Sequence, residues 1–141
     1  MNIAFDAKRI THNATGLGNY SRFVLGTLTE FLPENRYLLY SPSVGNPELY
    51  RQLLTHRSVR LFIPHRALAL MGGSLWRNFS VPRHLRTQHV DLFHGLSNEL
   101  PVGLYNARRV GTVVTIHDLA FIRYPQFYKA IDRLLYRKKY G

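Results

Sequence analysis

Two polar residues, His117 and Asp118, directly follow the β-branched run Thr112–Ile116. Such a run suits a strand that is buried on both faces of a parallel sheet. An imidazole at a strand end can donate a hydrogen bond to a phosphate or sugar hydroxyl, or accept a proton as a general base. His117 is therefore the first candidate for a catalytic residue. Successive strand side chains point to opposite faces, so we expect Asp118 to cap the following turn rather than to relay a proton.

Two other apolar runs end in polar residues in the same way. Asn2–Phe5 is followed by Asp6, and Val90–Phe93 is followed by His94 and Gly95. In an open α/β sheet, ligands bind in the crevice beyond the carboxyl ends of the strands. Three strands with polar residues at that edge predict a single ligand site.

The tripeptide Gly16-Leu17-Gly18 opens a predicted helix. Free backbone N–H groups and the helix dipole at such a position favour an anion, and glycine permits close approach to the backbone. The alternative is that the two glycines only shape the loop. The spacing up to Ser21 resembles a dinucleotide-binding fingerprint. That fingerprint follows its strand directly, however, whereas residues 7–15 intervene here, which excludes an NAD or FAD site.

The elements that position these residues alternate between strands and helices. Apolar residues at spacings of 3, 4, 4 and 3 predict an amphipathic helix that Pro33 ends. This stripe consists of Leu17, Tyr20, Val24, Leu28 and Phe31. A polar loop, Thr11–Thr15, precedes it. The remaining predicted elements are strands over Tyr37–Tyr40 and Val59–Ile63, a short helix over Glu48–Leu54, a helical segment Ala67–Thr87 divided by Gly72-Gly73 and Pro82, and a last helix from Ile131.

This alternation predicts a mostly parallel sheet in an α/β, Rossmann-like three-layer sandwich. Right-handed crossovers favour the strand order 3-2-1-4-5, with a switch point between the first and fourth strands. The loops 7–18, 95–106 and 117–127 then surround one crevice. We expect residues 1–141 to form one domain, and the last helix to continue in a longer polypeptide.

The composition excludes several classes of protein. The chain has no cysteine, which excludes disulfides, thiol catalysis and cysteine-based zinc sites. The histidines show no recurring ligand spacing, so we expect no metal and no other cofactor. Nucleophile-elbow and Walker motifs are absent. Asp6 interrupts the first apolar run too early for a signal peptide, and Ala67–Met71 is too short to span a membrane. We therefore expect a cytoplasmic domain.

The charge is unusual, with a formal net value of +11 and an isoelectric point near 10.4. No acidic residue lies between Glu48 and Asp91, a segment that contains Arg51, Arg57, Arg60, Arg66, Arg77, Arg83 and Arg86. Such an excess attracts nucleic acid, anionic lipid or phosphorylated substrates. The alternative is an ordinary solvated basic surface.

Four segments, in this order along the chain, resemble the amino-terminal half of the group 1 (family 4) glycosyltransferases. They are Phe5-Asp-Ala-Lys-Arg9, Thr15-Gly-Leu-Gly-Asn-Tyr20, Asp91-Leu-Phe-His-Gly95 and Val113-Val-Thr-Ile-His-Asp-Leu-Ala-Phe121. The stretches 124–128 and 132–136 are also similar, whereas residues 42–88 contribute little. Each motif is weak alone, and their ordered occurrence carries the resemblance.

The resemblance implies one half of a GT-B architecture, in which two Rossmann-like domains face each other across a cleft. Such enzymes transfer a sugar from a nucleotide-sugar donor to a glycan or lipid-linked acceptor, with retention at the anomeric carbon and without a metal. It assigns His117 to the reacting sugar with Asp118 supporting it, Gly16, Leu17, Gly18 and Arg9 to the donor diphosphate, and His94, Asn98 and Glu99 to the acceptor side.

The same resemblance places most of the nucleotide-binding groups in a carboxyl-terminal domain that this sequence lacks. Stabilisation of the departing diphosphate is a large catalytic term, so we expect the chain alone to be inactive. An anionic membrane surface is a further expected partner, through an interfacial patch of Trp76, Arg77, Arg83 and Arg86. Two alternatives are a nucleic-acid-binding α/β module, for which no compact recognition motif is present, and a non-catalytic scaffold.

Overall fold

The computed structural model describes residues 1–65, 72–106, 109–118, 123 and 126, and within them the sheet has five strands in the order β3-β2-β1-β4-β5. All neighbouring strands are parallel. The strands are β1 (Asn2–Asp6), β2 (Arg36–Tyr40), β3 (Val59–Phe62), β4 (Leu92–Gly95) and β5 (Gly111–Val114). The predicted α/β Rossmann-like fold and its strand order are therefore confirmed.

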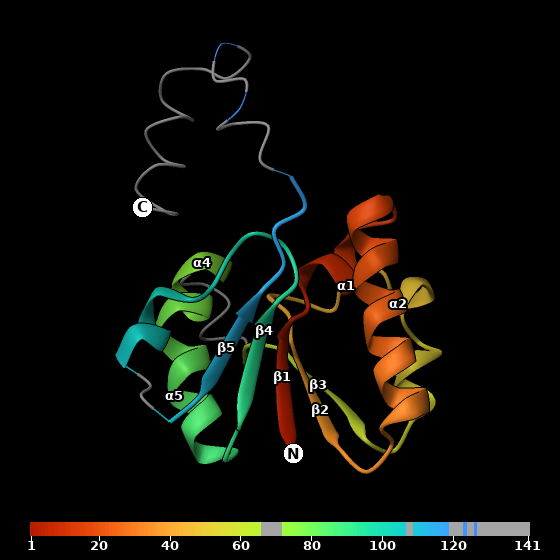
Figure 1. Ribbon diagram of the computed structural model, residues 1–141, viewed down its shortest axis with the longest axis horizontal. Helices are drawn as coiled ribbons and strands as arrows, with labels where there is room; N and C mark the ends of the chain where they lie inside the picture. The colour runs from red at the N-terminus through yellow and green to blue at the C-terminus, as the bar shows by residue number, and fades with distance from the viewer. Residues whose placement is uncertain (66–71, 107–108, 119–122, 124–125, 127–141) are drawn as a thin grey trace.

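The register brings the carboxyl ends of the strands to one edge of the sheet. Ile3 pairs with Tyr37 on one side and with Leu92 on the other, and β5 continues the sheet beyond β4. The chain direction places this edge at the top of Figure 1. The topological switch point lies between β1 and β4, where the sequence predicts it.

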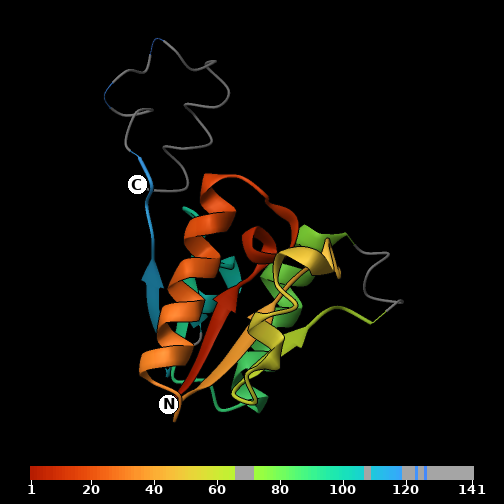
Figure 2. The same cartoon turned by 90° about the vertical axis from the view of Figure 1, so that its right-hand side faces the viewer.

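One face of the sheet is covered by α1 (Lys8–His12), α2 (Gly16–Phe31) and the short 3₁₀ turns η1 (Pro47–Leu49) and η2 (Leu53–Thr55). Figures 1 and 2 show α2 running along this face. The core beneath it includes Ile3, Phe5, Leu25, Tyr37 and Leu39. These strand residues occupy alternate positions, so they point to one face of the pleat.

The intervening positions form a second core on the opposite face. Its cover is a helical segment made of α4 (Gly73–Leu75), the π-helical turn η3 (Trp76–Ser80) and α5 (Val81–Thr87). This core includes Ala4, Leu38, Tyr40, Trp76, Leu85 and Phe93. β1 and β2 are thus buried on both sides, which explains their nearly continuous apolar sequences.

The prediction that Thr112–Ile116 is buried on both faces is wrong. The strand spans Gly111–Val114, and all four of its residues are exposed, with Val113 42% and Val114 37% accessible. β5 is at the sheet edge in the described structure. β-branched residues fit a pleated surface wherever it lies, so their enrichment indicates a strand but not its burial.

Three shorter elements also differ from the prediction. Lys8–His12 forms α1 where the loop was expected to begin, without a side-chain cap that the sequence could have revealed. In place of the helix predicted over Glu48–Leu54, the structure has the two short turns η1 and η2. β4 starts at Leu92 rather than at the predicted Val90, and His94 lies inside the strand. The expected helix from Ile131 lies outside the described residues, as do 124–125, 127–128 and 132–136 of the family resemblance.

The prediction that Pro82 divides the helical segment is wrong. The chain is helical from Gly73 to Thr87, and Pro82 is the second residue of α5. Proline lacks an N–H and crowds the preceding turn, and the π-helical η3 lies immediately before it. The wider turn lets the helix continue through this position.

Candidate active site at the carboxyl edge of the sheet

The imidazole of His117 is held at the carboxyl end of β5 by the loop that follows β4. Its Nε2 is 2.8 Å from the carbonyl oxygen of Leu96, and its backbone N–H donates to Oδ1 of Asn98 at 3.0 Å. A carbonyl oxygen only accepts, so Nε2 carries the proton and Nδ1 of the neutral ring is an acceptor. His117 is thus prepared to accept a hydrogen bond from a ligand hydroxyl.

The first turns of α2 lie against this imidazole. The rings of Tyr20 and His117 meet edge to face, with centroids 4.9 Å apart and an interplanar angle of 89°. Tyr20 is about one turn beyond Gly16, the first residue of α2. The structure therefore brings the Gly16–Gly18 turn and His117 to one edge, as their places after β1 and β5 predict.

A hydroxyl network connects β5 with the interior of β4. Thr115 Oγ1 is 2.8 Å from Nε2 of His94 and 3.4 Å from the hydroxyl of Tyr20. The His94 ring packs at 5.6 Å from the ring of Phe5, and burial lowers the pKa of His94. His94 is therefore neutral at physiological pH and supports the floor of the site rather than carrying charge.

Arg9 reaches the same edge from α1. Its Nε donates to the hydroxyl of Ser97 at 3.1 Å. The loop that holds Ser97 turns back so sharply that a Cβ on Gly95 would lie only 2.1 Å from the carbonyl oxygen of Glu99. Asn98 has φ +55°, which asparagine tolerates better than most residues, and its N–H donates to the Thr115 carbonyl at 2.9 Å.

Gly16 and Gly18 differ in what surrounds them. A Cβ on Gly18 would lie 1.8 Å from the carbonyl oxygen of Asn13. The backbone N–H of Gly18 already donates to Asn13 Oδ1 at 3.2 Å. Close packing thus explains glycine at position 18 without a ligand. A Cβ on Gly16 meets nothing within 4 Å. The open part of the helix start is therefore at Gly16, which is exposed, whereas Leu17 is half-buried.

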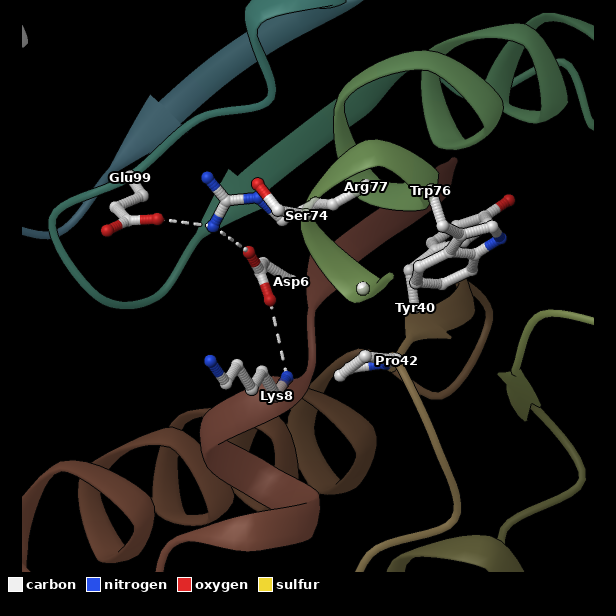
Figure 3. Close-up of a pocket in the computed structure, with 9 residues that line it drawn as sticks. Asp6, Lys8, Tyr40, Pro42, Ser74, Trp76, Arg77 and Glu99 are labelled. Carbon is white, nitrogen blue, oxygen red and sulfur yellow. Dashed lines mark hydrogen bonds and ion pairs between the residues drawn. The ribbon is translucent and has the colours of Figure 1, made fainter. Parts of the chain in front are cut away.

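Glu99 does not lie with His117. It forms an ion pair with Arg77, and the same Nη1 of Arg77 is 3.2 Å from Oδ2 of Asp6 (Figure 3). Oδ1 of Asp6 accepts the N–H of Lys8 at 3.3 Å. Burial raises the pKa of Asp6, and Arg77 offsets part of this effect.

These side chains line a cavity of about 280 Å³. Figure 3 shows Asp6 and Lys8 from the end of β1 and the start of α1, Arg77 and Trp76 from the helical segment, and Glu99 from the loop after β4. The site therefore has two parts, one around His117 and one around Arg77.

The interfacial patch expected from Trp76 and Arg77 is not formed. Trp76 is 7% exposed and belongs to the second core, and Arg77 is engaged by two carboxylates. The expectation rested on aromatic and basic residues occurring together, which does not reveal that Trp76 packs into the core. Arg83 and Arg86, from the same expected patch, are exposed.

Sequence reasoning missed Tyr20, Ser97 and Thr115, besides the role of Arg77. Tyr20 was counted in the apolar stripe of α2, although its hydroxyl could have marked it as a residue of the helix start. Asp118 follows His117 and is exposed, so its proposed supporting role toward His117 stays a prediction. Asn98 does contact His117, through the backbone of the latter.

Two features are absent from the residues that the structure describes. In residues 1–65, 72–106 and 109–118, no group of three or more acidic, histidine or cysteine side chains could hold a metal ion. Within the same part of the chain, no helix has the length and apolarity needed to cross a membrane.

The edge thus combines a helix start, a cation, an imidazole acceptor and a separate polar cavity. Helix-start amides and an arginine suit an anion, and an imidazole acceptor suits a hydroxyl group. Comparisons with family models, curated proteins and solved structures found no match to this chain.

Proposed function

We propose that this chain is the amino-terminal, acceptor-side domain of a retaining glycosyltransferase of GT-B architecture. Such an enzyme transfers a sugar from a nucleotide-sugar donor to a glycan or lipid-linked acceptor. The observation that carries the proposal is the packing of the His117 ring on Tyr20, next to the open start of α2. A diphosphate and a sugar hydroxyl need these two kinds of group within one site.

The proposed chemistry follows from the charge that develops during transfer. As the glycosidic bond to the donor breaks, negative charge accumulates on the departing diphosphate. The amides of Gly16 and Leu17 and the guanidinium of Arg9 stabilise that charge from one side. Nδ1 of His117 accepts a hydrogen bond from a hydroxyl of the reacting sugar or the acceptor and orients it.

The residues around His117 maintain this arrangement. The Leu96 carbonyl holds the imidazole, Asn98 accepts the backbone N–H of His117, and the Thr115 hydroxyl contacts His94. A second Rossmann-like domain is proposed to hold the nucleotide and to supply cations opposite the helix start. Without those cations the chain alone is expected to turn over no donor.

The test is a transfer assay with the entire product of the gene and a panel of nucleotide sugars. Release of the nucleoside diphosphate and the mass of the acceptor are measured together. We expect the His117→Ala variant to lower kcat/KM about 100-fold or more, because it removes a positioned polar contact to the reacting sugar.

His56→Ala is the matched control. His56 is exposed and precedes β3, so it lies at the opposite edge of the sheet, and its replacement should leave the rate unchanged. Wild-type activity in the His117→Ala variant, or turnover of no nucleotide sugar by the wild type, contradicts the proposal.

A further inference from the structure

The cavity around Arg77 is separate from the His117 part of the edge and is built from three distant segments. Asp6 ends β1, Arg77 lies in η3, and Glu99 follows β4 (Figure 3). The side chains of Asp6, Arg77 and Glu99 are 13%, 21% and 35% exposed. These charges are therefore held in place mostly away from solvent, where directed hydrogen bonds are strong.

The charges that line the cavity cancel one another. Asp6 and Glu99 supply two carboxylates, and Lys8 and Arg77 supply two cations. Both ion pairs use Nη1 of Arg77. A cavity with this balance offers no net attraction to a phosphate or to a metal cation, so it favours a neutral ligand with many hydrogen-bonding groups.

Arg77 retains hydrogen-bonding capacity beyond these ion pairs. Its Nε is buried and has no hydrogen-bond partner among the residues that the structure describes. A buried donor without a partner costs free energy, so the hydrogen bonds of this guanidinium are incompletely satisfied among those residues. The hydroxyl of Ser74 also lines the cavity, so neutral polar groups are present beside the charged ones.

One wall of the cavity is aromatic. The rings of Tyr40 and Trp76 lie 6.5 Å apart and tilted by 40°, and both line the cavity next to Pro42 (Figure 3). A pyranose ring has an apolar C–H face and a rim of hydroxyl groups. Aromatic and proline surfaces suit the first, and carboxylates with a guanidinium suit the second.

The size of the cavity is compatible with one such ring. Its volume of about 280 Å³ corresponds to about nine water molecules at roughly 30 Å³ each, which is at the lower limit of ligand pockets. A sugar ring fits this space.

We propose that the Arg77 cavity binds one neutral, unphosphorylated pyranose. Carboxylate oxygens of Asp6 and Glu99 and the guanidinium of Arg77 bind its hydroxyl groups, and Trp76 and Tyr40 contact its apolar face. Assigning this pyranose to the acceptor rests on the function proposed above, whereas the binding itself does not.

The sequence provides a direct probe, because Trp76 is its one tryptophan. The protein is titrated with methyl glycosides of common neutral hexoses while its tryptophan fluorescence is followed. Saturation-transfer NMR on the sugar protons is recorded in parallel. We expect at least one hexoside to give saturable binding, and its 6-phosphate and uronic acid counterparts to bind at least tenfold more weakly.

Two conservative variants, the rim variants, test the charged side chains that line the cavity. Glu99→Gln and Arg77→Lys each remove part of the hydrogen-bonding geometry, and we expect each to weaken binding at least tenfold. Glu99→Gln changes the most exposed of the three ionic groups, so it is the variant that best preserves folding. His56→Ala is the matched control, because His56 is exposed at the opposite edge of the sheet, and it should leave hexoside affinity unchanged.

Each outcome supports the proposal or overturns it. Failure of every neutral hexoside to bind, tighter binding of the charged counterparts, or unchanged affinity in both rim variants overturns it. Hexoside binding by an enzyme that transfers no sugar overturns the transferase proposal only. Transfer activity without hexoside binding, or with equal activity in the rim variants, overturns the cavity proposal only.

Discussion

At the scale of single residues, the two histidines of the carboxyl edge have different surroundings. His94 is enclosed between Phe5 and Thr115, and burial lowers its pKa. His117 is partly exposed and hydrogen-bonded to a carbonyl oxygen. The first is suited to remain neutral as a structural group, and the second to meet a ligand.

The lowered pKa of His94 predicts a pH dependence of stability. As the pH falls, the unfolded chain binds a proton at His94 near pH 6.5, whereas the folded chain binds it only at a lower pH. The free energy of unfolding therefore falls as the pH drops through that range, and this part of the loss is absent in His94→Gln. Urea unfolding of both proteins between pH 7.5 and pH 5.5 measures the difference. An NMR-titrated pKa of His94 at or above 6.5 contradicts the prediction.

Asp6 predicts a dependence of stability on pH with the same cause, burial, and the opposite sign. Its pKa is raised above 3.8 by burial, so the folded chain holds a proton that the unfolded chain has already released. The free energy of unfolding falls as the pH rises from 3.8 through the pKa of Asp6 in the folded chain, and Asp6→Asn removes this dependence on pH. The test is urea unfolding of both proteins from pH 4 to pH 7. A decrease of equal size in the variant contradicts the assignment to Asp6.

Polarity at strand ends was sufficient to predict that Asp6, His94 and His117 share one edge. The same pattern did not reveal Arg77, because its position depends on the π-helical turn before Pro82, which shifts the faces of the helix. Glu99 was predicted on the acceptor side with His94, but its carboxylate pairs with Arg77 in the cavity around that residue. Such long-range ion pairs leave no local signal in a sequence.

At the scale of elements, the start of α2 is organised by Asn13. Its Oδ1 accepts the N–H groups of Thr15 and Gly18 at 2.8 and 3.2 Å. These contacts satisfy amides that the first turn leaves without helical partners. The amides at Gly16 and Leu17 are those that the proposed diphosphate site uses.

The two glycines of this turn predict contrasting effects of the same substitution. Gly18→Ala places a Cβ against the Asn13 carbonyl, which is backbone and cannot rotate away. We expect it to lower the free energy of unfolding by about 1–3 kcal/mol. Gly16→Ala has open space and should change it by less than about 0.5 kcal/mol. Urea unfolding compares the two variants, and equal effects contradict the described packing.

Asn13→Ala provides an independent measurement on the same element. It removes the oxygen that two amides and the Thr15 hydroxyl share. The expected loss of stability is about 0.5–2 kcal/mol, the usual cost of losing a helix amino-terminal partner. The change is followed by the urea midpoint at constant m-value. A variant as stable as the wild type shows that Asn13 does not organise the turn.

At the scale of the whole molecule, the strand order is the one that short, right-handed crossover connections between parallel strands favour. The apolar runs of β1 and β2 identify the sheet centre because both faces are covered. The equally β-branched β5 is exposed at the edge. Strand existence and order are thus predictable from the sequence, whereas burial depends on which neighbours a strand receives.

The net charge of +11 predicts that the protein surface attracts anionic membranes. Exposed arginines such as Arg57, Arg60 and Arg83 are expected to draw the protein to anionic membranes. Sedimentation with anionic vesicles at low salt should exceed that with neutral phosphatidylcholine vesicles and decrease as salt is added. Equal sedimentation with both kinds of vesicle excludes a membrane role for this charge.

The most direct test of the central claim is an NMR titration of the labelled protein with a nucleotide sugar. The claim requires the start of α2 and the His117 imidazole to belong to one binding site. It predicts that the amides of Gly16 and Leu17 and the ring of His117 shift together with a single dissociation constant, while the nucleoside alone has no such effect. Shifts confined to other arginine-rich surfaces, or none at this edge, contradict the claim.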